Sequence, residues 1–360
     1  MRVSTGKDVA ELASVSLTAV SHVLNNTPGA RISPKVRERI LTAAAELNYR
    51  PNALARNLAL QKSHNVGVVV CRSKEYSPSA ESSYAFRIMK GIADSMIALE
   101  YDMPLFLVGN LGEFDYGRLF REKRVDGLIM LQTVNSDIDL LEKEETKYPI
   151  LLVGCHYPQT KLNYMDIDNV GGISQAMEHL VGLGHNRIAF LNGQLNLTNF
   201  AERLEGYKKA LKKHNIEFDS DIVYSDDVEK KAGFECFIRG LLSKKNRPTA
   251  ILAGNDEIAR ISILAIKNYG LSVPEDVAVI GFDDDVIARE FNPTLTTVRQ
   301  PMYEIGKVAA TELINHINSG GKQIKKILKT MLIVRESCGA KKMNGKGGGC
   351  SERKTVEVLV

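Results

Sequence analysis

The feature that most constrains this chain lies near its N-terminus, where residues 5–24 read TGKDVAELASVSLTAVSHVL. The apolar spacing predicts two short amphipathic helices joined by a tight turn at residues 14–16. Thr5 and Asp8 fit an [ST]-x-x-[DE] capping pattern for the first helix, and Ser16 is suited to cap the second. The side chains expected to face inward are Val9, Ala10, Leu12, Ala13, Val20, Val23 and Leu24. Such a helix-turn-helix can place its second helix in DNA, although helical hairpins are also common core elements.

The outer face of the second helix carries the candidate base-reading residues. They are Leu17, Thr18, Ser21 and His22. For Leu17 the alternative is plain packing against its neighbours. The next segment predicts a third helix that begins at Ser33 and Pro34. The side chains expected to face inward from it are Val36, Ile40, Leu41, Ala44 and Leu47. Three helices would close a small core.

The segment PNALARNLA at residues 51–59 follows this unit and is too short to be a stable helix on its own. It is therefore expected to act as a hinge that folds when something holds it. Residues 1–62 carry nine Lys and Arg against four Asp and Glu, a surplus of +5 in a chain whose net charge is +4. The basic surplus therefore lies in the segment expected to meet phosphates.

The five cysteines are odd in number, widely spaced and without a C-x-x-C pair, which favours reduced thiols inside the cell. Neither an export signal nor an apolar run of about 18 residues is present, so we expect a cytoplasmic protein with no membrane partner. No G-x-G-x-x-G after a strand, G-x-x-x-x-G-K-[ST] or G-x-S-x-G is found, which argues against a dehydrogenase, a kinase or another enzyme. A transport-associated sugar-binding protein would need an export signal in place of the basic N-terminal unit.

From residue 66 onward, short apolar runs alternate with amphipathic helices, which predicts an α/β core of parallel sheets flanked by helices. The apolar runs lie at residues 66–71, 103–108, 127–131, 150–154, 188–192, 250–254 and 277–282. Open α/β sheets bind ligands beyond the carboxyl ends of their strands, so polar residues that follow these runs are the candidate ligand-binding residues. They are Asn255, Asp283, Arg203 after the loop GQLNLTN, and Asn199 one turn before Arg203.

These side chains suit a hydroxyl-rich ligand, since Arg donates in a rigid fork, Asp accepts from paired hydroxyls and Asn does both. The alternatives are that Arg203 pairs with Glu202 or Glu205, that Asp283 caps a helix, and that Asn255 is an ordinary strand-end turn. Asp168, Asp256 and Asp284 are expected to have structural roles.

Several segments together resemble the lactose/galactose repressor (LacI/GalR) family. In the N-terminal part they are DVAELASVS, TAVSHVLN, ELNYRPN and ALARNLA. Downstream, in the family's order, they are RVDGLIM, HLVGLGHNRIAFLNG, ERLEGY, GNDEIA, VIGFDD, LTTVRQP and VRESC. The set spans residues 5–338. The resemblance implies a headpiece at 1–50, a hinge at 51–64 and a two-lobed core at 65–338 like that of periplasmic binding proteins, while the tail at 339–360 has no counterpart and is expected to be disordered.

The resemblance also assigns residues. Leu17, Thr18 and His22 match base-reading positions, Ser16 and Ser21 match phosphate contacts, and His22 departs from the common Arg. In the hinge it implies DNA contacts from Asn52, Ala55 and Leu58. Leu58 matches a leucine that wedges between base steps, with a buried contact against the core as its alternative. In the core it implies effector contacts from Asn199, Arg203, Asn255 and Asp283, and crossovers between the lobes near residues 165, 297 and 325.

Residues 82–86, SSYAF, replace the family's usual Asn-Pro-aromatic-aromatic stretch, so Tyr84 is expected to stack on the ligand and Phe86 to lie in the core. The function implied is a homodimeric repressor that binds a pseudo-palindromic operator and is controlled allosterically by a small polar effector. We expect neither a cofactor nor a metal. The effector is expected to be a sugar or sugar derivative, with a sugar phosphate or a purine as alternatives, and the sequence does not choose between inducer and corepressor.

Overall fold

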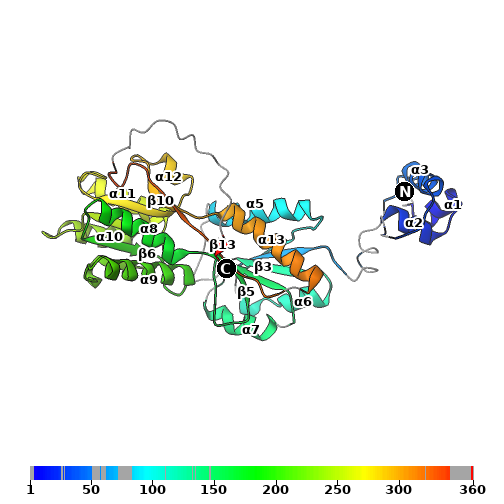
Figure 1. Cartoon of the computed structure of the whole chain (residues 1–360), viewed down its shortest axis with the longest axis horizontal. Coiled ribbons are helices and arrows are strands. Elements are labelled where there is room, and N and C mark those ends of the chain that lie inside the picture. The colour runs from blue at the N-terminus through cyan, green and yellow to red at the C-terminus, as the bar shows by residue number, and fades with distance from the viewer. Residues whose placement is uncertain are drawn as a thin grey trace. The chain divides into compact units, whose positions relative to one another are not determined.

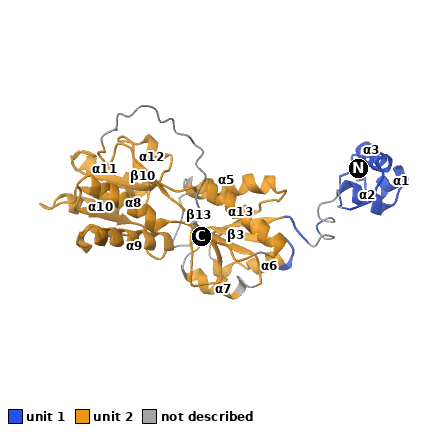
Figure 2. Cartoon of the chain, viewed as in Figure 1, with its two compact units in different colours: residues 1–64, 121–126 blue, residues 65–120, 127–360 orange. Residues whose placement is uncertain are grey.

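The computed structural model describes residues 4–25, 27, 29–50, 57, 62–71, 83–109, 111–131, 133, 135–145, 147–320, 322–340 and 358–359. The chain forms two compact units, which are residues 1–64 with 121–126, and residues 65–120 with 127–360 (Figure 2). No helix among the described residues is long and apolar enough to cross a membrane.

The N-terminal unit contains three helices, α1 (Gly6–Leu12), α2 (Leu17–Leu24) and α3 (Pro34–Glu46). Each begins at the residue that the sequence predicts. Thr5 and Asp8 form a reciprocal capping box, Ser16 Oγ accepts from Ala19 N at 3.1 Å, and Ser33 Oγ accepts from Val36 N at 3.4 Å. These caps satisfy backbone donors that have no partner inside a first helical turn.

The core of this unit is built from small and β-branched side chains, namely Val9, Ala10, Ala13, Val20, Val23, Ile40, Ala43 and Ala44. Leu12 and Leu41 were predicted to face inward, and this is wrong, because each is 49% exposed. Leu41 follows Ile40 directly and therefore lies about 100° around the helix from it. The small alanines fill the inward positions that the two leucines were expected to take.

The larger unit contains two mostly parallel sheets flanked by helices, as the sequence predicts (Figure 1). The first sheet has the order β13-β11-β5-β4-β3-β1-β2. Its strands are β1 (Val66–Cys71), β2 (Leu105–Val108), β3 (Gly127–Leu131), β4 (Ile150–Val153), β5 (Asn163–Ile167), β11 (Lys325–Leu328) and β13 (Val358–Leu359). The other elements of this N-lobe are α5 (Ser83–Ala98), η1 (Leu111–Glu113), α6 (Tyr116–Arg121), η2 (Asn135–Asp137), α7 (Ile138–Glu145) and α13 (Met302–Ser319).

The second sheet has the order β12-β10-β9-β8-β6-β7. Its strands are β6 (Ile188–Asn192), β7 (Val223–Ser225), β8 (Ala250–Ala253), β9 (Ala278–Asp283), β10 (Thr296–Arg299) and β12 (Met331–Ile333). The other elements of this C-lobe are α8 (Asn169–Gly182), α9 (Thr198–Lys213), η3 (Ser220–Ile222), α10 (Lys231–Leu242), α11 (Asp256–Asn268) and α12 (Ile287–Glu290). Phe190 packs with residues of α8 and α9, whereas Leu191 packs with residues of α10 and α11. Since neighbouring strand residues point to opposite faces, the two helix pairs cover opposite faces of this sheet.

Within the described residues, three crossings join the lobes. The chain passes between the sheets after β5 at residues 167–169, after β10 at 299–302 and after β11 at 328–331. Each crossing lies a few residues beyond the predicted position. Both lobes are thus assembled from separated stretches of chain, and polar residues at the crossings lie next to both sheets.

One expectation is corrected in the N-lobe. Phe86 was placed in the core, but its side chain is 66% exposed on α5, one position after the buried Ala85. Of the tail at 339–360, which was expected to be disordered, the structure describes only residues 339, 340, 358 and 359. Val358 and Leu359 form β13 and pair antiparallel with Leu328 and Ile327 of β11. An edge strand offers unpaired N–H and C=O groups, and the alternating sequence VEVLV suits pairing with it.

Candidate functional site

The outward face of α2 is accessible where the sequence places the base readers. Leu17 is 47% exposed, Thr18 and Ser21 are exposed, and His22 is partly buried. A Cβ at Gly6 would lie 3.1 Å from Leu17 Cδ1, so Leu17 packs against the start of α1 with one side and faces solvent with the other. Ser16 uses its hydroxyl as the cap of α2.

Arg39 holds the turn between α1 and α2, a role that the sequence analysis missed. Its Nη2 donates to the carbonyl of Ala13 at 2.6 Å and to the carbonyl of Ser14 at 3.0 Å. These carbonyls follow the last turn of α1, where C=O groups lack helical partners. Arg39 on α3 therefore helps to set the angle at which α2 leaves the turn.

The predicted hinge contacts Asn52, Ala55 and Leu58 lie outside the described residues. The chain after them is held at one point by Asp126. Its Oδ1 accepts from Ser63 N at 2.7 Å and from Ser63 Oγ at 2.9 Å, and its Oδ2 accepts from His64 N at 2.8 Å. One carboxylate thus fixes the residues that immediately precede β1.

In the larger unit, Arg203 is only 2% exposed despite its charge. Its Nε donates to Asn169 Oδ1 at 3.0 Å and its Nη1 donates to the Gly254 carbonyl at 2.6 Å. Its guanidinium carbon lies 3.9 Å from the centre of the Phe282 ring. Burial lowers the pKa of Arg203, opposed by the charge of Asp283. Of the two carboxylates named as alternative partners of Arg203, Glu205 pairs with Lys209, and Glu202 accepts a hydrogen bond from Asn169.

Asp283 ends β9 and accepts from Gln300 Nε2. Its φ of 134° lies where side chains other than glycine are strained, and such positions cluster at ligand sites. Burial raises the pKa of Asp283 to about 7, although the charge of Arg203 and the bond from Gln300 oppose the shift. The helix-cap alternative for Asp283 is therefore not supported.

Asn255 is the N-cap of α11, where its Oδ1 accepts from Ile258 N at 2.8 Å. The alternative stated for Asn255 was an ordinary strand-end turn, and the cap of a helix was not foreseen for it. Because the side-chain oxygen is engaged in the cap, the amide nitrogen is the group that remains to donate to a ligand.

A narrow pocket brings Tyr84 and Asn199 together, although they come from α5 and α9. It has a volume of about 20 Å³ and is lined by Tyr84, Thr133, Gly154, Cys155, Leu197, Thr198 and Asn199. Tyr84 approaches Gly154 closely, since a Cβ there would lie 2.4 Å from its hydroxyl. The pocket thus lies between the lobes.

The loop after β6 contributes polar atoms that the sequence analysis did not single out. Asn192 Oδ1, Gln194 Oε1 and Thr198 Oγ1 are buried and have no hydrogen-bond partner within the described part of the chain. Buried oxygens of this kind are costly unless a ligand or water pairs with them. The amide-rich sequence NGQLNLTN was the available signal.

The three carboxylates expected to be structural do serve the fold. Asp168 caps α8 through Gly171 N at 2.7 Å. Asp256 accepts from Thr297 Oγ1 and from Asp285 N. Asp284 pairs with Arg299 and Arg335, and these cations lower its pKa against the effect of burial.

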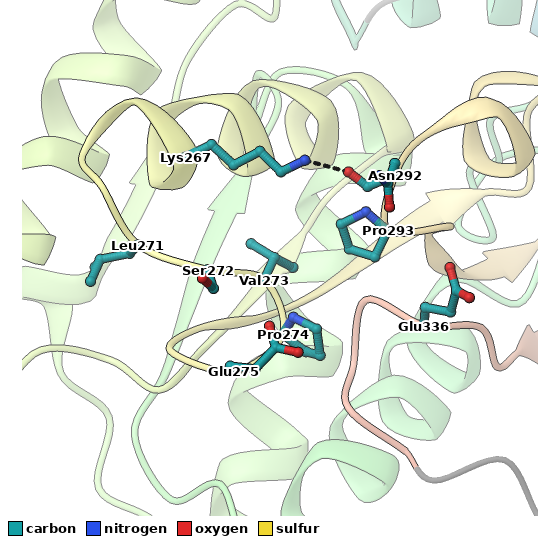
Figure 3. Close-up of a pocket in the computed structure, with 9 residues that line it drawn as sticks. All are labelled: Lys267, Leu271, Ser272, Val273, Pro274, Glu275, Asn292, Pro293 and Glu336. Atoms are coloured by element: carbon teal, nitrogen blue, oxygen red, sulfur yellow. Dashed lines mark hydrogen bonds between the residues drawn. The ribbon is translucent and has the colours of Figure 1, made fainter.

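A larger hollow of about 410 Å³ lies elsewhere on the C-lobe, between the end of α11 and the loop after α12 (Figure 3). Its lining includes Lys267, Glu275 and Glu336 but none of the candidate effector residues. Lys267 already donates to the Asn292 carbonyl, and Glu336 already accepts from Thr294. The convergence of buried polar groups favours the interlobe site over this hollow.

Comparison with known proteins agrees with both parts of this architecture. Residues 5–52 match bacterial regulatory proteins of the lacI family, and residues 177–338 match the periplasmic binding protein-like domain. The regulator NtdR of the NTD biosynthesis operon of Bacillus subtilis is 32% identical over 92% of this chain and 98% of its own length. The chain belongs to the LacI family. The transcriptional repressor PurR of Aliivibrio salmonicida is 33% identical over 87% of this chain and 92% of its own length.

Solved LacI-family structures match the whole architecture. The Lac repressor dimer bound to operator and the anti-inducer ONPF has a TM-score of 0.81 and 29% identity, covering 94% of this chain and all of that one. The CelR–cellobiose complex has a TM-score of 0.68 and 28% identity, covering 93% and 99%. As a LacI-family protein, this chain is a DNA-binding transcriptional repressor regulated by a small ligand, and its relatives are not enzymes.

Proposed function

We propose that the effector is a sugar or sugar derivative bound between the lobes, and that its binding changes the affinity for a pseudo-palindromic operator. The observation that carries the proposal is the buried Arg203 on the face of the Phe282 ring, with the carboxylate of Asp283 close enough for the two charges to affect each other's pKa. A guanidinium donates to hydroxyl oxygens, a carboxylate accepts from hydroxyls, and an aromatic face packs against C–H groups.

Further polar groups support a polyhydroxylated ligand. The orphaned oxygens of Asn192, Gln194 and Thr198 can accept hydrogen bonds, and Thr198 lines the interlobe pocket together with Tyr84 and Asn199. A site rich in acceptors suits a ligand with many hydroxyl donors better than a phosphate, which brings only acceptors at its charged end. The solved structure of CelR, to which this chain is structurally similar, is a complex with cellobiose.

For DNA we assign the contacts to the exposed face of α2, with Leu17, Thr18 and His22 toward bases and Ser16 and Ser21 toward phosphates. Asn52, Ala55 and Leu58 complete the proposed interface from the hinge. Lobe movement can reach the hinge because Asp126, which holds Ser63 and His64, directly precedes β3 of the N-lobe. A ligand that prefers one lobe arrangement would then shift the fraction of protein with DNA-competent hinges.

The proposed assembly is a homodimer. The N-lobe exposes apolar side chains on α5 and on the edge strand β2, among them Ile97 at 76% and Leu107 at 62%. Exposed apolar groups gathered on neighbouring elements favour a protein interface. A two-fold operator also requires two headpieces.

A thermal-shift screen of the full-length protein tests the effector class, with sugars, sugar phosphates and nucleobases as probes. A ligand bound only by the folded state raises stability by about 2.7 kcal/mol at a hundredfold excess over its Kd. We expect a sugar to shift the transition, Arg203→Lys to abolish that shift, and Arg187→Lys to preserve it, since Arg187 pairs with Asp219 on the same lobe. A shift by nucleobases alone would refute the sugar assignment, and an undiminished shift in Arg203→Lys would refute the site.

A further inference from the structure

His156 lies between two carboxylates that come from different lobes. It follows β4 in the N-lobe, and its Nδ1 is 3.1 Å from Asp166 Oδ2 on β5. Its Nε2 is 2.9 Å from Glu202 Oε1 on α9 of the C-lobe. The Asp166 side chain is almost fully buried, and those of His156 and Glu202 are largely buried.

When both carboxylates are ionised, this geometry places a proton on each ring nitrogen. Burial raises the pKa of Asp166, and the hydrogen bond and charge of His156 oppose that shift. An ionised carboxylate can only accept hydrogen bonds, and a neutral imidazole has a single N–H, so two such contacts require the imidazolium. The two carboxylates outweigh the effect of burial and raise the pKa of His156 to about 10. His156 is therefore a cation across the neutral pH range.

The contact with Glu202 continues to the effector-site arginine. Glu202 Oε2 accepts from Asn169 Nδ2 at 3.0 Å, and Asn169 Oδ1 accepts from Arg203 Nε at 3.0 Å. Asn169 is the first residue of α8, directly after a crossing between the lobes. An unbroken series of polar contacts thus joins Asp166 in the N-lobe to Arg203 in the C-lobe.

From this series we infer that His156 is a positioning residue for Arg203: as a cation it holds Glu202, and through Asn169 it orients the guanidinium and ties it to the N-lobe. The inference rests on the proposed role of Arg203 in effector binding. Loss of the cation would leave Glu202 facing the buried Asp166 without a charge between them, and would free Glu202 to move toward Arg203. The effector site would then lose its fixed donor geometry.

The surroundings of His156 add few competing charges. On β5, the Tyr164 ring centre lies 5.3 Å from the His156 ring centre, and Lys325 Nζ on β11 lies 5.7 Å from the Tyr164 ring centre. Tyr157 follows His156 directly, and burial raises its pKa, so it stays neutral. On α9 the facing groups are Glu202 and Arg203, and on β5 the facing carboxylate is Asp166.

The same three residues have donor atoms within 4.8 Å of one another and so qualify as possible metal ligands. The two carboxylates, however, lie against different ring nitrogens. A structural zinc site uses four ligands, and this cluster offers three. The arrangement therefore fits a protonated ring better than a metal, and zinc is an outcome that the test must detect.

The first experiment follows the His156 ring by NMR in the full-length protein labelled at histidine Cε1, with His156→Gln to assign its signal among the seven histidines. We expect no titration midpoint below about pH 9 and no change on adding stoichiometric ZnCl2. A midpoint near the ordinary value of 6.5, or a signal that moves on adding zinc, would overturn the inference. This measurement needs no effector, so it stays informative if the sugar proposal fails.

The second experiment asks whether the effect reaches Arg203, through its Nε–H resonance. We expect this resonance to move in His156→Gln and in Glu202→Gln, and to move no further in the double variant, because both changes break one series of contacts. Glu178→Gln is the matched control, since Glu178 pairs at 2.6 Å with Lys213 of the same α9. Additive shifts, or an equal shift in the control, would show that His156 does not act through Glu202.

A sugar that binds in the screen gives the functional readout. We expect about tenfold weaker binding in His156→Gln and in Glu202→Gln, and unchanged binding in Glu178→Gln. Should His156→Gln fail to fold, the ring titration of the unaltered protein and the Glu202→Gln variant still decide the question. Unchanged affinity in Glu202→Gln would overturn the positioning role.

Discussion

The guanidinium of Arg203 lies 3.9 Å from the centre of the Phe282 ring, so the buried arginine rests on an aromatic face that belongs to the neighbouring strand β9. Phe282 also approaches Gly172 of α8, where a Cβ would lie 2.9 Å from its ring. One ring therefore supports both the candidate effector residue and the helix that begins at a crossing between the lobes. Cation–π contacts of this kind contribute up to about 2 kcal/mol when they are desolvated.

Phe282→Leu should weaken effector binding as well as the fold. Phe190→Leu is the matched control, because Phe190 is equally buried in the same sheet but stacks on Tyr207. Both changes leave a cavity and should cost about 1 to 3 kcal/mol in urea unfolding. Only Phe282→Leu should lower affinity for a sugar found in the screen, measured by calorimetry. Equal sugar affinities in the two variants would show that the Phe282 ring does not contribute to ligand binding.

Asp283 predicts a pH dependence of stability. Burial raises its folded pKa to about 7 from 3.8, so the folded state binds more protons than the unfolded state between these values. Its contribution is therefore most favourable below about pH 4 and is lost as the pH rises through 7. The free energy of unfolding of Asp283→Asn, relative to that of the unaltered protein, should therefore be about 2 kcal/mol higher at pH 8 than at pH 5.

The measurement is urea unfolding followed by circular dichroism at both pH values. Asp219→Asn is the control, because backbone and Arg187 contacts lower the pKa of Asp219 and leave it ionised throughout this range. Its effect should be the same at pH 5 and pH 8. A flat profile for Asp283→Asn would mean that Asp283 stays ionised in the folded protein.

Arg39→Met should loosen the helix-turn-helix. The change removes two hydrogen bonds to the turn carbonyls of Ala13 and Ser14, and each contributes on the order of 1 kcal/mol. Lys35→Met removes the same charge from α3, one turn earlier, and controls for weaker attraction to phosphate. We expect a lower thermal midpoint for the headpiece and weaker DNA binding in Arg39→Met than in Lys35→Met. Identical DNA affinities would show that only charge matters.

His22→Arg should change which operator the protein selects. Arginine can donate two hydrogen bonds to a guanine edge in the major groove, and such a contact discriminates by about 1 to 3 kcal/mol. Selection from random-sequence duplexes should enrich a guanine at symmetric positions in both half-sites. His316→Arg, on α13, adds the same charge away from the headpiece and should leave the selected sequence unchanged. An unaltered consensus in His22→Arg would remove His22 from the base-reading set.

Gly91→Ala should destabilise the N-lobe. Helices α5 and α13 approach so closely that a Cβ at Gly91 would lie 2.0 Å from the Tyr303 carbonyl oxygen. Separating the helices should cost about 1 to 3 kcal/mol. Gly240 lies inside α10 with open space around it, so Gly240→Ala should instead stabilise by about 0.5 to 1 kcal/mol. Thermal unfolding of the two variants should shift in opposite directions.

The sequence by itself determined the elements whose causes are local. Thr5, Ser16 and Ser33 cap their helices because a side-chain oxygen three residues away meets an unpaired backbone N–H. The apolar runs became strands, and the polar residues at their ends could be named as candidates because strand ends meet along one edge of a sheet. Periodicity was less reliable for single positions, as Leu12, Leu41 and Phe86 show.

Only the tertiary structure decided what depends on contacts between distant segments. It buried Arg203 against Phe282 and Asn169, and placed Asp166, His156 and Glu202 together. It also paired Val358 and Leu359 with β11, far from them in sequence. Whether a charge is buried or a histidine ring is protonated depends on neighbouring residues, which the three crossings between the lobes bring together. The distances between such residues cannot be read from the order of residues along the chain.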